Sequence, residues 1–357
     1  MADAWRYLCL ILIAIVASGC ATKQYQFDYH NTTVEKNWPT PPDMPRYKFV
    51  GFITGENNFV LDENKQSYFA KSIDWIKELL VGESVPRQLF RPQGGYFDNK
   101  KKRLYVSDIG HKAIYVFDFL QNQLDVWEQA DELVRFVSPI GIAVGNNMTV
   151  YVSDSALSYV VKLDDSGKPL AKFGEGLLQR PTGLAFDQQS QRLFVADSKL
   201  HQILVFDTDG KLKFKIGEKK SSVNGYFNSP TYLAIAREKL IVSDTLNARV
   251  QLFDLQGKWL QSFGKRGMYV GNLPRPKGVA VDTENNIYVV ESYYDHLLVF
   301  NEQGEALLPI GGRGKQVGQF DLPTGVWLDS ENNIYVADMF NSRISVFQML
   351  NVEDKKK

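Results

Sequence analysis

Acidic side chains recur along this chain at nearly constant intervals, and each ends a short apolar run such as Tyr-Val-Ser. Successive acids are 43 to 47 residues apart. They are Asp108, Asp154, Asp197, Asp244, Glu291 and Asp338. A carboxylate in a loop can bind a metal ion or ligand, or it can accept hydrogen bonds from nearby backbone N–H groups. Because these acids share one position of a repeat, we expect the five aspartates to be structural.

Glu291 is the exception, because a glutamate side chain is longer than an aspartate, and we expect a different role for it. Tyr293, Tyr294 and His296 follow it closely. Tyrosine and histidine can contact a ligand, and they are equally common as packing at the edge of a sheet. We therefore treat these four residues as a candidate ligand-contacting cluster, with edge packing as the alternative.

Three arginines share another repeat position, directly before a proline in the first, third and fifth units. They are Arg91, Arg180 and Arg275. Guanidinium groups at equivalent points could face one anionic ligand together. The alternative is that each arginine pairs with an acid of a nearby loop.

Familiar catalytic arrangements are missing from the sequence, so no catalytic residue is predicted. The four histidines, at 30, 111, 201 and 296, form no His-x-x-x-His or His-Glu-x-x-His pattern. There is no Gly-x-Ser-x-Gly elbow, no Walker loop and no Cys-x-x-Cys-His for covalent haem. These observations favour a protein that is not an enzyme and has no cofactor. A divalent metal held by residues distant in sequence is the alternative that stays open.

The candidate residues are positioned by a repeat with further fixed marks. A proline precedes each acid by 14 to 16 residues, an aliphatic residue follows it by six, and Phe or Leu follows it by nine. The fifth unit, 276–311, contains four short apolar runs separated by turns and a short loop. A period in the forties built from short strands predicts a β-propeller. The predicted fold class is all-β, with six blades of four antiparallel strands.

The last blade is predicted to close with a strand from the other end of the chain. The sixth unit stops near residue 350, after only three strands. Residues 46–52 match the fourth strand of the third unit, at 213–217. A ring that joins its first and last strands leaves no open sheet edge. We therefore expect residues 46–350 to form the whole propeller.

The two faces of such a ring differ in their loops. The tight-turn face carries the short turns between strands one and two and between strands three and four of each blade. The long-loop face carries the loops between strands two and three and the links between blades, including 265–275 and 313–322. Longer and more varied loops favour the long-loop face as the working surface.

The chain outside the propeller divides into further segments. Residues 1–20 resemble a bacterial lipoprotein signal peptide, with a short apolar core and the sequence Ala-Ser-Gly-Cys, so Cys20 is the predicted lipid attachment site. Residues 21–45 are rich in proline and predict a polar tether. An insertion at 55–87 contains a predicted amphipathic helix at about 67–81. Residues 351–357 form a charged tail.

The repeat resembles that of NHL-repeat β-propellers. The resemblance rests on the stretches 276–282, 333–338 and 341–347 and covers all six units. The second unit departs from it at Leu157 and Tyr159, and in the fourth unit Thr231-Tyr232 replaces the usual x-Gly. In layout the chain is most similar to bacterial envelope lipoproteins with this repeat. The resemblance implies the fold but selects no single activity.

The leading hypothesis is a lipid-anchored extracytoplasmic protein that binds a protein or peptide partner on its long-loop face. The chain has 41 basic and 41 acidic residues, which predicts no nucleic-acid partner. If the host has two membranes, Ala21 after Cys20 favours anchoring in the outer one, on its periplasmic or surface side. We expect the domain to be monomeric. The alternatives are a metal-dependent hydrolase or lyase with a site at the central channel, and a sensor for a small anionic ligand.

Overall fold

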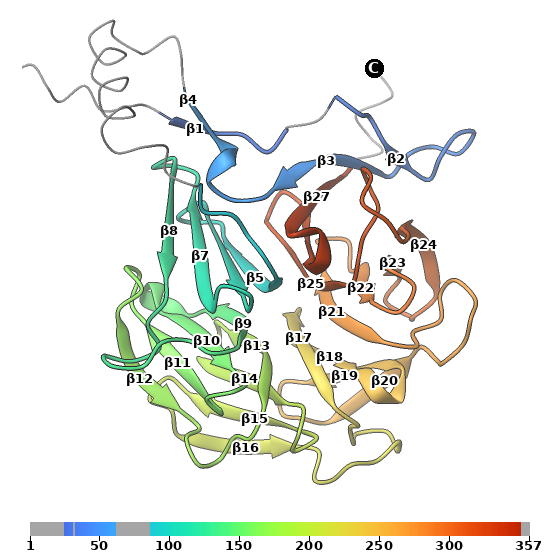
Figure 1. The fold of residues 1–357 in the computed structure, drawn as a ribbon. Helices are drawn as coiled ribbons and strands as arrows, with labels where there is room; N and C mark the ends of the chain where they lie inside the picture. The colour runs from blue at the N-terminus through green and yellow to red at the C-terminus, as the bar shows by residue number, and fades with distance from the viewer. Residues whose placement is uncertain (1–24, 31–32, 62–85, 351–357) are drawn as a thin grey trace, which may run out of the picture.

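A computed structural model describes residues 25–30, 33–61 and 86–350, which form a ring of six β-sheets (Figure 1). In each of the first five sheets, four antiparallel strands follow one another in chain order. The predicted six-bladed β-propeller is confirmed. Within the described ranges, helical structure is limited to single turns of 3₁₀ helix.

The strand bounds follow the repeat. Blade 1 contains β5 (Pro92–Asp98), β6 (Arg103–Asp108), β7 (Ala113–Asp118) and β8 (Gln123–Trp127). Blade 2 contains β9 (Pro139–Val144), β10 (Val150–Asp154), β11 (Tyr159–Leu163) and β12 (Pro169–Phe173). Blade 3 contains β13 (Pro181–Asp187), β14 (Arg192–Asp197), β15 (Gln202–Asp207) and β16 (Leu212–Ile216).

The second half of the ring has the same order. Blade 4 contains β17 (Pro230–Ala236), β18 (Lys239–Asp244), β19 (Arg249–Asp254) and β20 (Trp259–Phe263). Blade 5 contains β21 (Pro276–Val281), β22 (Ile287–Glu291), β23 (His296–Phe300) and β24 (Ala306–Gly311). Blade 6 contains β25 (Pro323–Leu328), β26 (Asn333–Asp338) and β27 (Arg343–Met349), together with strands from the N-terminal segment.

The first strand of every blade begins at the repeat proline and contacts the first strands of its neighbours. Its pairing with the second strand is irregular just after the proline, as between Pro92 and Gly95. Gly94 lies in this irregular stretch, and a Cβ there would lie 2.5 Å from the carbonyl oxygen of Ile140 in the next blade. Glycine therefore allows neighbouring inner strands to approach closely around the axis.

The hydrophobic core lies between the blades. The second and third strands are buried on both faces, and all residues of β7 are buried. Tyr105, Phe136 and Val152 belong to the cluster that joins blades 1 and 2. Sheets that are packed on both faces require apolar side chains in both directions, which explains the unbroken apolar runs of these strands.

The N-terminal strand β3 (Tyr47–Ile53) closes blade 6, as the sequence predicts. It pairs with β27 antiparallel, and the partners include Ile344 with Ile53 and Met349 with Tyr47. A further strand, β2 (Asn37–Trp38), pairs with the outer edge of β3 and makes this sheet five-stranded. The closure covers the edge that β27 would otherwise expose.

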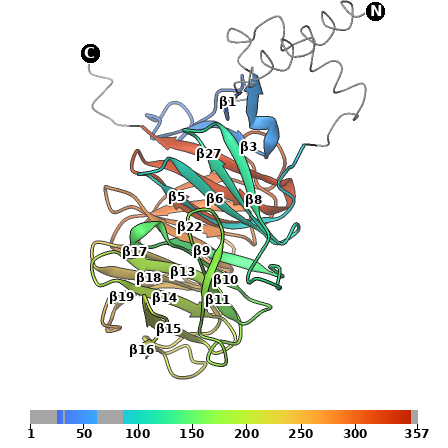
Figure 2. The ribbon, with the colours of Figure 1, turned by 90° about the vertical axis from the view of Figure 1, so that its left-hand side faces the viewer.

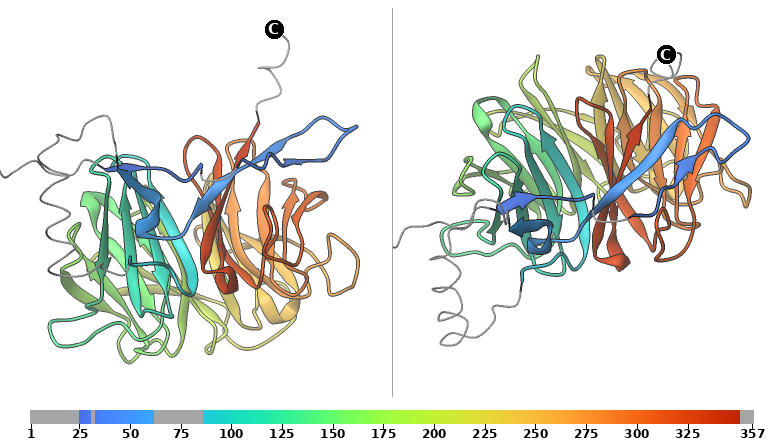
Figure 3. Two further views of the ribbon diagram at one scale, coloured as in Figure 1. Left: turned by 45° about the horizontal axis from the view of Figure 1, so that its top comes forward. Right: turned by 90° about the horizontal axis from the view of Figure 1, so that it is seen from above.

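The segment predicted to be a tether, residues 21–45, packs against the propeller where the structure describes it. β1 (Tyr25–Phe27) pairs with β4 (Phe59–Leu61), and the Phe27 ring stacks on Phe119 with 4.3 Å between centroids. Trp38 is only 7% exposed and packs edge-on against Phe347. Of these aromatic side chains, Trp38 is thus buried and Phe27 partly buried against the propeller. Figures 2 and 3 show this segment along the outer edge of the ring.

Several sequence predictions lie outside the described residues. They are the signal peptide, Cys20, the helix at about 67–81 and the charged tail. Among the described residues, no helix has the length and apolar character of a membrane span.

Candidate functional site

The repeat acids lie where the second strand of each blade reaches the long-loop face, and their carboxylates hold the incoming link. Asp108 is fully buried and accepts hydrogen bonds from the backbone N–H groups of Phe90 (2.6 Å), Arg91 (3.1 Å) and His111 (2.9 Å). Asp154 and Asp197 accept equivalent bonds in blades 2 and 3. A carboxylate with several backbone donors fixes the conformation of two loops at once.

Two of these acids also bind an arginine that was not predicted from the sequence; Arg343 is buried and Arg249 is largely buried. Arg249 Nε lies 2.8 Å from Asp244 Oδ2, and Arg343 Nε lies 2.8 Å from Asp338 Oδ2. Burial raises the pKa of both carboxyls, and the arginines oppose this shift. The signal was present in the sequence, because an Asn-x-Arg follows the acid only in these two units.

Glu291 takes the place of an aspartate in blade 5 and keeps the same kind of partners. Its carboxylate accepts hydrogen bonds from the backbone N–H groups of Arg275 (2.9 Å), Tyr293 (3.1 Å) and Tyr294 (2.8 Å). Burial raises the pKa of Glu291, and these donors offset part of the shift. The nearby charge of Asp295 raises the pKa further.

Beside Glu291 the long-loop face is hollowed into a small pocket of about 160 Å³, which we call the loop pocket. Its walls include Glu291, Tyr294 and His296 together with Met268 and Tyr269 from the link between blades 4 and 5. Burial lowers the pKa of His296, which favours the neutral imidazole. The structure thus brings three of the four predicted cluster residues to one pocket.

The fourth, Tyr293, points elsewhere and is 59% exposed. Its ring lies edge-on to Tyr294, and the guanidinium of Arg275 lies over it at 6.0 Å. Arg91 is similarly placed over Phe90, at 5.2 Å, and faces Phe340 at 6.0 Å. Two of the three predicted arginines therefore contact aromatic rings.

The three arginines are exposed on the long-loop face, and none forms an ion pair with a carboxylate among the residues that the structure describes. Arg180 contributes its backbone N–H to Asp197, at 3.0 Å. Pairing with loop acids, the alternative interpretation, is thus not seen for these side chains. Their guanidinium groups remain available for a partner.

Exposed apolar side chains are concentrated on the same face. Of twenty large hydrophobic residues that are exposed in the described part of the chain, eleven lie in links or loops of the long-loop face and two in turns of the tight-turn face. We call six of the eleven, which run from the link before blade 5 to the link before blade 1, the apolar arc. They are Met268, Tyr269, Val270, Tyr293, Phe340 and Phe90.

Comparison with known proteins identifies the family of the chain. Residues 91–311, well over half of its length, match the SMP-30/Gluconolactonase/LRE-like region. The chain belongs to this family. Residues 275–355 also match a domain described as a 6-bladed beta-propeller. The predicted NHL-type propeller is therefore confirmed at the level of repeat and fold.

The individual relatives are distant. Protein brain tumor of Drosophila melanogaster is 27% identical over 135 residues, which are 37% of this chain and 13% of that protein. The chain therefore matches only about an eighth of the length of this curated relative.

Among solved structures, virginiamycin B lyase from Staphylococcus aureus is 11% identical, with a TM-score of 0.55 over 90% of this chain and 98% of that one. A gluconolactonase from Xanthomonas campestris is 14% identical, with a TM-score of 0.55 over 73% of this chain and 87% of that one. At these identities the likeness shows the fold alone.

Whether the central channel of a chain in this family can hold a divalent metal ion depends on the donor atoms that line the channel. The channel wall of this SMP-30/gluconolactonase/LRE-like chain carries no carboxylate, imidazole or thiol among its described residues. Elsewhere in the described part of the chain, no group of three or more His, Cys, Asp or Glu could hold a metal ion. Divalent cations require oxygen, nitrogen or thiolate ligands converging on one point. The described channel residues therefore do not fit a resident metal, and we derive no metal-assisted step.

Proposed function

We propose that this protein is a lipid-anchored extracytoplasmic binding protein that holds a protein or peptide partner on its long-loop face. The observation that carries the proposal is the apolar arc together with its uncompensated arginines. Exposed apolar side chains that gather on one face of a protein often mark an interaction site. Aromatic residues, methionine and arginine are also the residues enriched at the centres of protein interfaces.

The arginines favour a protein or peptide partner over a small anion. Arg91 and Arg275 lie over Phe90 and Tyr293, so their guanidinium groups extend flat aromatic surface rather than face one common point. A stacked guanidinium keeps its N–H donors for a carboxylate of the partner. Lys265, Arg266 and Lys315 are exposed beside the arc. The best-fitting partner is therefore a segment with apolar anchor residues flanked by acidic ones.

The loop pocket provides a place for one anchor side chain. It lies next to the arc and is lined by Met268 and Tyr269, which belong to the arc, and by the buried Glu291. Interfaces gain most of their affinity from a few side chains that fill such pockets. The rigid propeller presents the pocket and the arc without an ordering cost, since the links are held by the repeat acids.

The N-terminal segment suggests how the anchored protein would be oriented. β1 starts at Tyr25, close after Cys20, and the Phe27 N–H donates to Asn122 in a turn of the tight-turn face, at 2.9 Å. A lipid on Cys20 would therefore hold the tight-turn side toward the membrane. The long-loop face would remain free for a partner.

Affinity isolation after chemical cross-linking in the host cell tests the proposal. The full-length protein should recover a reproducible partner, and the double variant Arg91→Glu/Arg275→Glu should lose it without a lower melting temperature. The matched control, Lys211→Glu/Lys258→Glu, reverses two exposed charges at turns of the tight-turn face and should retain the partner. Equal recovery by both double variants would contradict the proposal.

A hydrolase or lyase is the second candidate, because family membership favours it. Its test is elemental analysis of the purified protein together with an assay for lactone hydrolysis. A stoichiometric divalent ion and metal-dependent turnover would support the enzyme. Neither result follows from the described channel residues, whose side chains include no carboxylate, imidazole or thiol.

A further inference from the structure

The fourth blade departs from the repeat at a position where the other inner strands carry glycine. The equivalent residue of β17 is Tyr232. The glycines of the other blades are Gly94, Gly141, Gly183, Gly278 and Gly325. Blade 4 therefore places a phenol where its neighbours have only a hydrogen atom, next to the central axis.

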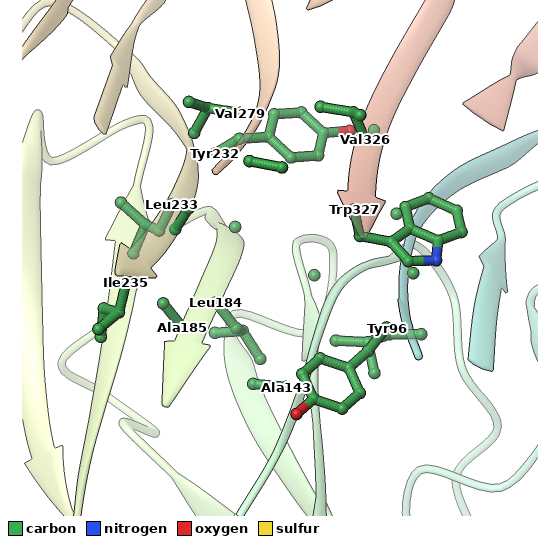
Figure 4. Close-up of a pocket in the computed structure, with 18 of the residues that line it drawn as sticks. Tyr96, Ala143, Leu184, Ala185, Tyr232, Leu233, Ile235, Val279, Val326 and Trp327 are labelled. Atoms are coloured by element: carbon green, nitrogen blue, oxygen red, sulfur yellow. The ribbon is translucent and has the colours of Figure 1, made fainter. Parts of the chain in front are cut away.

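Tyr232 reaches across the axis to the opposite blade. Its hydroxyl donates a hydrogen bond to the carbonyl oxygen of Gln93 in β5, at 3.2 Å, and the Thr324 hydroxyl donates to the same oxygen at 2.9 Å. In Figure 4 the Tyr232 ring extends past Val279 toward Val326. Gln93 and Thr324 directly follow the repeat prolines, at the long-loop end of the inner strands. Tyr232 therefore closes the channel at that end.

Beyond Tyr232 the channel forms a cavity of about 330 Å³. Small and apolar side chains line it (Figure 4). They include Ala143, Ala185, Leu233, Val279, Val326 and Trp327. From the middle of the inner strands toward the tight-turn face, the exposure of the side chains increases. Leu233 and Val279 are buried, whereas Ile235 and Val281, nearer that face, are half-buried. The cavity is therefore entered from the tight-turn face.

The wall carries no charged side chain, and its side chains with a hydroxyl or amide group are those of Tyr96, Gln188 and Tyr232. Gln188 donates its amide to the Val144 carbonyl oxygen at 2.8 Å, and Tyr232 is engaged with Gln93. The Trp327 indole N–H is buried and has no acceptor among the described residues. This donor is buried in the core between blades 6 and 1, so it adds no exposed polar group to the cavity wall.

We propose that this cavity is a binding pocket for a small neutral molecule, aromatic or aliphatic, that enters from the tight-turn face. Dry apolar cavities of roughly 150 Å³ already bind benzene. About twice that volume suits a molecule with two aromatic groups. The pocket is separated from the long-loop face by Tyr232 and does not depend on a partner bound there.

The test is a fluorescence titration of the full-length protein with N-phenyl-1-naphthylamine, a neutral probe with two aromatic groups, a phenyl and a naphthyl. The wild type should bind one equivalent saturably. Ala234→Trp and Val281→Trp fill the cavity from blades 4 and 5, and each should weaken binding by about tenfold or more. The matched control Ala171→Trp, on the exposed strand β12, should bind as the wild type does. Thermal melting of each variant verifies its fold.

Hydrogen exchange locates the site independently of any variant. Probe binding should protect the inner strands around 184–185 and 233–235. The proposal is overturned if the wild type shows no saturable binding, or if folded cavity variants bind unchanged. It is equally overturned if Tyr269→Ala abolishes binding or protection falls on the long-loop links, since the probe would then occupy the apolar arc.

Discussion

Two of the repeat acids are each stabilised by one arginine. Arg343 binds Asp338 through Nε, and its other nitrogens donate to the carbonyl oxygens of Lys315 and Gln319 at 3.0 and 2.9 Å. Its guanidinium also lies over the Phe52 ring of the closing strand, at 3.9 Å. One side chain thus joins a repeat acid, a blade link and the N-terminal strand.

Replacing Arg343 should therefore destabilise the propeller strongly. Arg343→Ala leaves a buried carboxylate without its counter-ion, which we expect to lower the free energy of unfolding by about 3 kcal/mol. Arg135→Ala is the matched control, because Arg135 pairs with Glu128 at the surface and should cost less than about 1 kcal/mol. Chemical denaturation of the two variants measures both values. Similar small losses would contradict the buried role of Arg343.

Glu291 predicts a pH-dependent difference in stability. Burial raises its pKa above the ordinary value of 4.5 in the folded state, so its contribution is most favourable at low pH and is lost as the pH rises through the raised pKa. Glutamine in its place does not titrate. The free energy of unfolding of the wild type minus that of Glu291→Gln should therefore fall between about pH 4 and about pH 7. Denaturation at both pH values checks the sign, and a difference that rises would refute it.

At the residue scale, the positions of the candidate residues could be predicted from the sequence better than the groups that their side chains contact. The six acids and three arginines were found by their phase in the repeat. The stacking of Arg91 on Phe340 could not be predicted, because these residues are about 250 positions apart and meet only through ring closure. Tyr232 was visible as a departure from the repeat, but its reach to Gln93 depends on the width of the ring.

At the scale of elements, strand β3 was predictable because it repeats the pattern of another fourth strand. β1 and β2 were not, since strands of three and two residues carry no periodicity that distinguishes them from a tether. Their aromatic residues were the available signal. A proline-rich segment with Trp38 and Phe27 can bury rings wherever the propeller offers an apolar edge.

Trp38 should therefore matter for the stability of the whole propeller. Its ring packs on Phe347 in the sheet that closes the ring, so Trp38→Ala should lower the free energy of unfolding by about 3 kcal/mol. Leu120→Ala, at a side chain that is 66% exposed, serves as the control and should have little effect. If Trp38→Ala is as stable as the control, the N-terminal segment is not part of the folded unit.

At the scale of the whole molecule, the ring separates two working surfaces. The long-loop face carries the apolar arc, the loop pocket and the three arginines, which form no ion pair with the part of the chain that the structure describes. The tight-turn face carries the entrance to the channel cavity, and the N-terminal segment contacts a turn of this face at Asn122. Sequence could assign the faces, because loop length follows the repeat. It could not show that Tyr232 closes the channel between them.

The anchoring proposal makes its own prediction. Cys20→Ser removes the thiol that would carry the lipid, so the variant should move from the membrane fraction to the extracytoplasmic soluble fraction. Fractionation and immunoblotting measure the distribution. Retention of the variant in the membrane fraction at the level of the wild type would contradict lipid attachment at this residue.

Site-specific photo-cross-linking from the two faces tests the central claim most directly. A photoreactive amino acid at position 269, in the apolar arc, should form a defined cross-linked product with a partner in the host cell. The same residue at position 120, in a turn of the tight-turn face, should not. Products of equal yield from both positions, or a product from position 120 alone, would contradict the assignment of the long-loop face as the binding surface.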